Sequence, residues 1–252
     1  TDSLQHEYGA DIVLDLAAEE EAQIVGFGGS RPEAEEVVTL PSDVYDTIDG
    51  IRAATRVGEF EATLQPPTGV PYYRLLAVER ATFPQVAYFR SDYASESLGE
   101  LMNRLAQDPK GILLSRSTAA QMIANVGDIV IVNVRTYDDT WLTYDARVAG
   151  LFTQFPTMYP QDRPVVVANL DYLELNAGLL PHDVWLSTTP NADNETVVRD
   201  INKQLKIPLS KVKDLKEALD TESQRLERTG IFGLLTFCFV AGAALSVVDV
   251  LV

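Results

Sequence analysis

The feature that most limits the fold of this chain is its last stretch, residues 230–252, which reads GIFGLLTFCFVAGAALSVVDVLV. About 20 mainly apolar residues are enough for an α-helix to cross the hydrocarbon layer of a membrane. The stretch has no polar face with the 3.6-residue period of a surface helix, which argues against a buried amphipathic helix. We therefore predict a transmembrane helix at 230–252, the start of a following membrane region, in a piece of a larger membrane protein.

Asp249 is the only formal charge in that stretch. A carboxylate within a bilayer is costly unless it faces protein, water or an interface, so it is by default a functional residue. Asp249 also stands close to the far end of the predicted span, where it would cost little. Both interpretations are open. Gly242 and Ser246, one turn apart, offer a small-residue surface for another membrane helix.

Composition excludes several classes of function. The chain of 252 residues has 37 acidic and 20 basic side chains and a net charge of −17. Nucleic-acid affinity comes mainly from clustered lysine and arginine, so no nucleic-acid partner is expected. A single cysteine, Cys238, permits neither an intramolecular disulfide nor a multi-cysteine zinc site. His6 and His182 are interpreted as surface or loop residues rather than metal ligands.

The motifs of common enzymes are missing from the sequence. No lysine is followed by serine or threonine, which excludes a standard phosphate-binding loop, and GFGGS at 26–30 is interpreted as a flexible turn. The acidic runs at 19–21 and 33–36 are interpreted as solvated surface. Asn194 begins a glycosylation sequon, but a helix cap is the simpler account. We expect no catalytic residue, no metal and no cofactor, hence a protein that is not an enzyme.

Hydrophobic periodicity predicts strands and helices in alternation. The predicted strands are 11–16, 22–27, 51–64, 72–78, 112–115, 130–134, 142–148, 164–168 and 183–188. The predicted helices are 42–50, capped by Ser42, one within 95–111 that Pro109 and Gly111 terminate, and 118–124, 170–176, 194–205 and 210–229. The order has no regular βαβ rhythm and no internal repeat, which favours an α+β fold in two lobes.

Four segments together resemble the extracytoplasmic, MacB-like periplasmic core domain of the FtsX-like permeases. These permeases are the membrane subunits of a group of ABC transporters that includes MacB and the lipoprotein-releasing LolC and LolE. The segments are SRSTAAQMIANVGDIVIVNV (115–134), YDARVAGLFTQFP (144–156), VVVANLDYLELNAG (165–178) and DVWLSTTPNADNETVVRDINKQL (183–205). The passage with Gly127 and Asp128 is the most specific, and we expect both residues to shape a turn.

The resemblance implies a bilobed extracytoplasmic domain over residues 1–209, with a βαβ-type lobe and a strand-rich lobe inserted at roughly 80–165. A charged coupling helix at 210–229 would join it to the transmembrane helix. The soluble domain would then lie on the extracytoplasmic side of the cell (plasma) membrane. The implied partners are an ABC ATPase subunit, the membrane lipid bilayer and an envelope protein or lipoprotein or lipid cargo, in a dimer of permease subunits.

The function implied is that of a permease domain that couples ATP hydrolysis by a separate ATPase to export, extraction or mechanotransmission at the outer membrane face. The alternative is a scaffold or signalling module that transports nothing and recruits a cell-wall hydrolase or another envelope partner. A membrane-anchored enzyme is a third hypothesis, for which the sequence offers no nucleophile, base or metal cluster.

Overall fold

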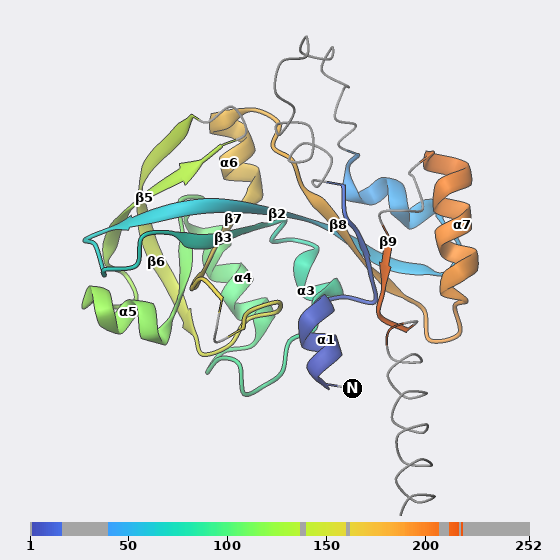
Figure 1. Cartoon of the computed structure of the whole chain (residues 1–252), viewed down its shortest axis with the longest axis horizontal. Helices are drawn as coiled ribbons and strands as arrows, with labels where there is room; N and C mark the ends of the chain where they lie inside the picture. Colours follow the sequence, from blue (N-terminus) through green and yellow to red (C-terminus); the bar gives the residue numbers. More distant parts are fainter. Residues whose placement is uncertain are drawn as a thin grey trace, which may run out of the picture.

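The computed structural model describes residues 2–16, 40–136, 140–159, 162–206, 212–216 and 218. Within them the chain forms one mixed sheet of nine strands with helices packed on its faces (Figure 1). The strands are β1 (Ile12–Leu14), β2 (Ile51–Gln65), β3 (Tyr73–Val78), β4 (Ile112–Ser115), β5 (Ile129–Arg135), β6 (Trp141–Phe152), β7 (Val165–Asn169), β8 (Asp183–Thr188) and β9 (Val212–Asp214). The helices are α1 (Asp2–Tyr8), the 3-10 helix η1 (Ser42–Thr47), α3 (Phe83–Val86), α4 (Leu98–Gln107), α5 (Arg116–Met122), α6 (Leu170–Ala177) and α7 (Asn194–Leu205).

Six of the strands close into a ring. Their order is β3-β7-β4-β6-β5-β2, and β2 also pairs with β3, which completes the circle. The pairs β3–β7 and β4–β6 are parallel, and the other ring pairs are antiparallel. Every ring strand therefore has a hydrogen-bonded neighbour on each side, and the ring leaves no open edge of its own.

The remaining strands form an extension of the sheet, in the order β8-β1-β9, all antiparallel. The extension is joined to the ring by β2, which is 15 residues long. Residues Ile51–Val57 of β2 pair with β8, and Val57–Gln65 pair with β3 and β5. In Figure 1 this strand runs across the middle of the molecule, with the ring at the left and α7 at the right.

Three buried clusters account for the packing. The first fills the ring with alternate residues of its strands and is closed by side chains from α5 and α6. The second lies on the outer face of the ring, beneath α3 and α4, and reaches Trp185 in β8. The third joins β1 and β8 to η1 and α7 through Leu14, Leu186 and Ile201. Alternation places one face of each ring strand inside the ring. The outer faces of β3, β4 and β7 belong to the second cluster, whereas those of β5 and of the first half of β6 are exposed or half-buried.

Most predicted elements are present, with bounds that differ from the predicted ones by at most four residues. α4 follows its sequence signature closely, because Ser97 accepts a hydrogen bond from the Glu100 amide while the Glu100 carboxylate accepts one from the Ser97 amide. This reciprocal pair is a capping box. The predicted strands at 130–134 and 142–148 form the antiparallel hairpin β5–β6. The α+β interpretation is confirmed at the level of a mixed α/β chain with one large mixed sheet.

Three local predictions are wrong. Ser42 does not cap a helix: it is the first residue of η1, follows Pro41 at the cap position, and donates to Glu79 instead. Asn194 is likewise the first residue of α7 rather than its cap, which is Asp193. The helix predicted from Ser210 does not include Val212–Asp214, which form β9, because pairing with the open edge of β1 outweighs helix propensity there.

Several predictions fall on residues outside the described ones. They are the strand at 22–27, the turn at 26–30, the acidic runs at 19–21 and 33–36, most of the helix at 210–229, and the transmembrane helix at 230–252. Among the described residues, none of the helices is both long and apolar enough to cross a membrane. The division of residues 1–209 into two lobes with an insertion at 80–165 stays a prediction.

Candidate functional site

An open groove of about 740 Å³ lies on the outside of the ring. Its sides come from β2, β3, the end of β5 and the segment between β6 and β7. The lining residues are Glu59, Phe60, Glu61, Arg74, Arg135, Thr157, Tyr159, Asp162 and Arg163. Glu59 and Glu61 face outward because the residues that alternate with them, Phe60 and Ala62, belong to the cluster inside the ring.

Charges of opposite sign alternate along this groove. Glu61 accepts from Arg135 at 3.0 Å and from Arg163, and these two hydrogen bonds lower the pKa of the Glu61 carboxyl. Arg74 forms an ion pair with Glu59 at 2.9 Å. The guanidinium of Arg163 also lies over the Tyr72 ring, 5.8 Å from its centroid. A groove of this kind suits a polar ligand or a peptide with charges of both signs.

One wall of the groove touches the N-terminal helix α1. The His6 Nε2 atom bonds the Met158 carbonyl at 2.6 Å, and the Thr157 amide donates to the His6 carbonyl at 2.8 Å. On the groove side, Arg74 donates to the carbonyl and the hydroxyl of Thr157 at 2.5 and 2.6 Å. Burial, with the charge of nearby Glu7, raises the pKa of Tyr159 to about 12.

A second polar cluster lies where the extension joins the ring. Arg56 of β2 forms ion pairs with Glu174 at 2.9 Å, Asp171 at 3.1 Å and Glu79 at 3.3 Å. Burial disfavours the charged guanidinium, but the hydrogen bond that Arg56 donates to Glu174 and the charges of Glu79 and Glu174 raise the Arg56 pKa overall. The cluster ties α6 and the end of β3 to β2, which is a structural task.

His182 is buried beside this cluster, with only 2 % of its surface exposed. The interpretation of His182 as a surface residue is therefore wrong, although it does lie in a loop, between α6 and β8. Its Nδ1 atom is 3.0 Å from the Leu180 carbonyl and 3.7 Å from a Glu174 oxygen, and its Nε2 atom has no hydrogen-bond partner. Burial lowers the His182 pKa, so the imidazole is neutral at pH 7.

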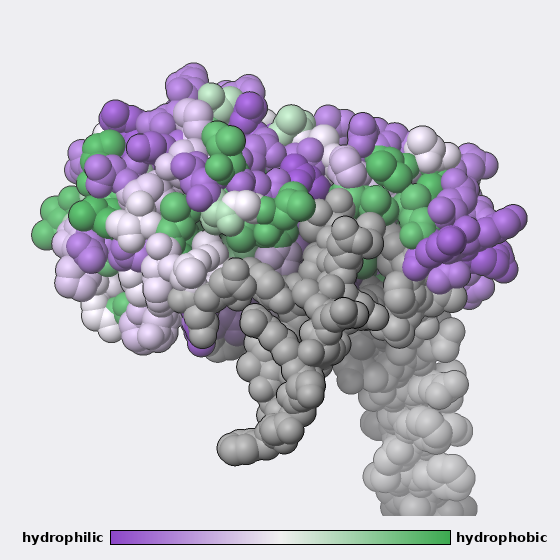
Figure 2. Space-filling model, turned by 90° about the horizontal axis from the view of Figure 1, so that it is seen from above, coloured by the Kyte–Doolittle hydropathy of each residue, from purple (hydrophilic) through white to green (hydrophobic). Residues whose placement is uncertain are grey.

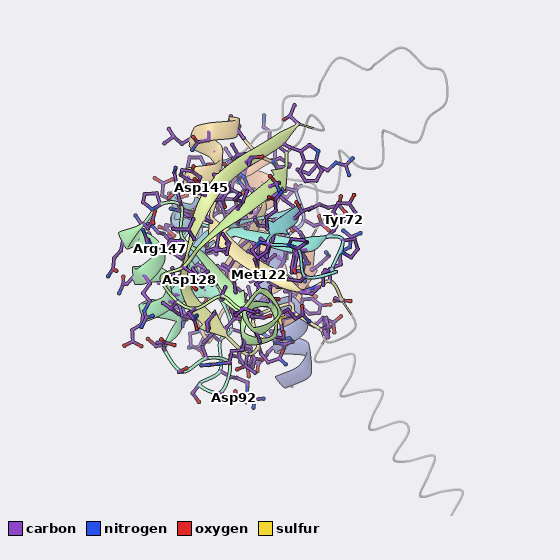
Figure 3. The ribbon with its side chains drawn as sticks, turned by 90° about the vertical axis from the view of Figure 1, so that its left-hand side faces the viewer. Tyr72, Asp92, Met122, Asp128, Asp145 and Arg147 are labelled. Atoms are coloured by element: carbon purple, nitrogen blue, oxygen red, sulfur yellow. The ribbon has the colours of Figure 1, made fainter. Side chains whose placement is uncertain are left out.

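The passage with Gly127 and Asp128 forms the turn between α5 and β5. Gly127 has a φ of +99°, which favours glycine, and its amide donates to the Val148 carbonyl at 2.8 Å. The Asp128 carboxylate accepts from the Asn125 amide at 2.8 Å. Arg147 donates to the Gly127 carbonyl at 2.8 Å, and Figure 3 shows Asp128 and Arg147 close together. Both predicted turn residues thus shape this end of the ring.

Exposed aliphatic side chains surround the same turn. Ile123 is 88 % exposed, Ile129 52 % and Val126 47 %. Ile123 also has a φ of +56°, a conformation that β-branched residues rarely adopt. Figure 2 shows hydrophobic groups over the ring divided by hydrophilic ones on the face seen from above. We call Ile123, Val126 and Ile129 the aliphatic tip.

The other predicted site residues have structural contacts. His6 is half-buried in α1 rather than on the open surface. The Asn194 side chain is buried and donates to Asp214 at 2.7 Å, which ties α7 to β9. Among the described residues, no three histidine, cysteine or acidic side chains gather in a way that could hold a metal ion. Sequence reasoning missed the groove, whose residues come from distant positions.

Comparisons with known proteins give structural neighbours only. No protein-family model matches the sequence, and no curated protein matches it. A domain of a protein described as a permease from Porphyromonas gingivalis has 16 % identity and a TM-score of 0.40, over 66 % of this chain and 74 % of that one.

Two further solved structures are similar. The periplasmic region of MacB from Actinobacillus actinomycetemcomitans has 10 % identity and a TM-score of 0.45, over 88 % of this chain and 94 % of that one. The extracellular domain of YknZ, a noncanonical ABC-type transporter from Gram-positive bacteria, has 11 % identity and a TM-score of 0.44, over 73 % and 95 %. The three similarities are thus to a domain of a permease, to a periplasmic region and to an extracellular transporter domain, each at low sequence identity.

Proposed function

We propose that this chain is the extracytoplasmic domain of an ABC transporter permease, followed by a transmembrane helix at 230–252. In this role it couples ATP hydrolysis by a separate ATPase to export, extraction or mechanotransmission at the outer membrane face. The extracytoplasmic domain extends through β9 to Asp214, beyond the predicted end at 209, and the charged residues up to 229 connect it to the membrane. The motifs at 115–134 and 144–156 support the family, and the pairing of the chain ends supports the mode of action.

The observation that carries the proposal is the pair β1–β9. These strands come from opposite ends of the described chain, yet they pair in register from Ile12–Asp214 to Leu14–Val212. The Leu215 amide also donates to the Asp11 carbonyl at 3.0 Å. The chain therefore enters and leaves the sheet at one edge. Movement of the proposed transmembrane helix that follows β9 would reach both of these strands.

The side chains along this edge reinforce the connection. Lys213 of β9 forms an ion pair with Asp15 at 2.9 Å, and that hydrogen bond raises the Lys213 pKa. Asn194 holds the start of α7 to Asp214. After β9 the backbone becomes helical at Leu215. A helix that begins directly at the sheet edge would pass a push or a rotation on to β9 and β1 with little slack.

The test is to purify the full-length permease in detergent and to ask whether an ATPase subunit copurifies whose turnover depends on it. Arg225→Pro would break the predicted coupling helix, and Arg225→Ala, which keeps helix propensity, is the matched control. We expect the ATPase to copurify with both variants and to lose its coupled turnover only with proline. Absence of any ATPase, with none in the same polypeptide, would overturn the proposal.

The aliphatic tip favours the second candidate, a scaffold that recruits a cell-wall hydrolase or another envelope partner. Three exposed aliphatic side chains on one turn suit contact with another protein. If the chain is a scaffold, it moves no cargo, and Ile123→Asp would abolish the recruitment of its partner. In the transporter, the same variant would reduce cargo-dependent ATP turnover. Measuring both with one variant separates the two candidates.

A further inference from the structure

We propose that residues 157–159 are a movable wall of the arginine-lined groove, and that the position of α1 sets this wall through His6. The inference rests on the proposed function only in one respect, namely that the transmembrane helix at 230–252 supplies the movement, through β9 and its partner β1. The coupling itself is a property of the described residues. It links α1 to the groove on the outside of the ring.

Consecutive residues of the wall face α1 and the groove in turn. Thr157 donates its amide to the His6 carbonyl and accepts two hydrogen bonds from Arg74, through its carbonyl and its hydroxyl. Met158 accepts a bond from His6, and Tyr159 lines the groove while its ring packs edge-on against His6 at 5.6 Å. A shift of α1 therefore cannot leave the groove wall in place without breaking hydrogen bonds.

His6 is fixed through both nitrogens. A carbonyl only accepts hydrogen bonds, so Nε2 must carry the proton that goes to Met158. In the neutral imidazole Nδ1 is then an acceptor, and the Tyr93 hydroxyl, 2.8 Å away, donates to it. Tyr93 in turn accepts the amides of Thr153 and Gln154 at its carbonyl, at 2.6 and 3.1 Å. His6 is thus a positioning residue. It contacts the wall directly at Met158, and through Tyr93 it is connected to residues 153 and 154 just before the wall.

The backbone strain at Thr157 favours movement of the wall. Its φ of +62° lies in the left-handed region, which a β-branched residue adopts only when its surroundings impose it. Here His6 imposes it from one side and Arg74 from the other. If the His6 contacts are lost, Thr157 can relax to an ordinary backbone conformation and withdraw its carbonyl from Arg74. Arg74 would keep its ion pair with Glu59, and the groove would change shape.

The test is hydrogen exchange, followed by mass spectrometry, on the full chain in detergent without any ATPase. His6→Phe keeps the ring but removes both of its hydrogen bonds, and we expect at least tenfold faster exchange at 153–159. Arg74→Lys keeps the charge beside Glu59 but removes the fork that holds Thr157, and we expect at least threefold faster exchange in α1. This reciprocity is what coupling requires. A purely local role would change only the segment that each variant touches.

Two further variants make the test decisive. Arg163→Lys alters the same groove without touching Thr157, so it should leave exchange in α1 within twofold of wild type. Thr157→Gly adopts the positive φ without strain, so it should reduce the effect of His6→Phe on the wall to less than threefold. The proposal is overturned if Arg74→Lys leaves α1 unchanged, or if Arg163→Lys alters α1 equally. Because no ATPase is present, failure of the proposed function would leave this result standing.

Discussion

The six-stranded ring and the three-stranded extension differ in how they are stabilised. The extension needs the ring, but the ring does not need the extension. The ring closes through β2–β3, so all of its strands keep two neighbours when β8, β1 and β9 are removed. The extension needs β2 for its pairing with β8, and its outer strand β9 has three residues. Closure therefore makes the ring independent, whereas the extension is stable only on the ring.

The two regions also differ in what the chain ends contribute. The ring uses no residue before Ile51, and its core is a contiguous cluster inside the strands. The extension is built from both ends of the described chain, through β1 and β9. The region that meets the proposed membrane segments is thus the less independent one. Low local stability is typical of elements that move.

The largest effect is expected from a cavity inside the ring. Leu75 is fully buried there, so Leu75→Ala should lower the free energy of unfolding toward the upper end of about 2–5 kcal/mol. Because the extension needs β2, hydrogen exchange should speed up in both regions. Leu179→Ala, at a site 74 % exposed, is the control and should cost less than about 0.5 kcal/mol. Loss of protection confined to the ring would contradict the one-way dependence.

A cavity in the extension should act differently. Leu14 of β1 is fully buried among β8, η1 and α7, so Leu14→Ala should cost about 2–4 kcal/mol of local stability. We expect faster exchange in β1 and β8, with β4 and β6 protected as in wild type. The same measurement, peptide-resolved hydrogen exchange, reports both regions at once. Equal losses in β4 and β6 would mean that the chain unfolds as one unit.

The third test concerns the junction between the two regions. Burial lowers the pKa of His182, which faces Arg56, Glu174 and Glu79. The unfolded chain, with a histidine pKa of about 6.5, therefore binds a proton that the folded chain does not. Stability should fall as the pH drops below that value and level off below the folded pKa. Between pH 7.5 and 5.5 the loss from this group is at most about 1.4 kcal/mol.

His182→Gln keeps a neutral polar side chain at this position and removes the titration. Urea unfolding at pH 7.5 and 5.5 gives the free energy of unfolding at each pH. The loss of free energy between the two pH values should be smaller for the variant than for wild type. His6→Gln is the matched histidine control. If the pH dependence of the His182→Gln protein equals that of wild type, His182 does not couple the junction to pH.

The comparison also shows what the sequence can predict. α4 and the hairpin β5–β6 were predictable because their periods and their caps lie within short segments. Ring closure was not, since the parallel pair β3–β7 joins residues about ninety positions apart and leaves no local pattern. β9 was predicted as a helix because its residues favour one, and only the open edge of β1 makes it a strand.

The candidate site was less predictable than the fold. His6, Arg74 and Thr157 are ordinary residues in their own segments, and only the fold brings them together. The burial of His182 had a local signal, since it stands between the apolar pair Leu179–Leu180 and the strand residues Val184–Leu186. The turn at Gly127 was predictable because a positive φ favours glycine there. The strain at Thr157 had no sequence signal at all.

The smallest expected effect is a difference in the free energy of unfolding between glycine substitutions at two helix ends, one in each region. α5 in the ring and α7 beside the extension both end on a non-glycine residue in the left-handed conformation, Ile123 with φ +56° and Lys206 with φ +58°. This conformation costs L-residues about 1–2 kcal/mol, partly offset by the entropy of glycine in the unfolded chain. Ile123→Gly should therefore stabilise the protein by about 0.5–1 kcal/mol, and Lys206→Gly by less, because lysine is not β-branched.

Urea unfolding of the two glycine variants compares their free energies of unfolding directly. Partner recruitment by the same two variants is the second measurement. An exposed isoleucine held in a strained conformation makes no contribution to the core, and the scaffold candidate gives it a role in partner contact. We expect Ile123→Gly to gain stability and lose partner contact, while Lys206→Gly changes neither by much. If Ile123→Gly instead destabilises the ring, the isoleucine supports the fold. The strain at Ile123 would then be no reason to regard the aliphatic tip as a contact surface.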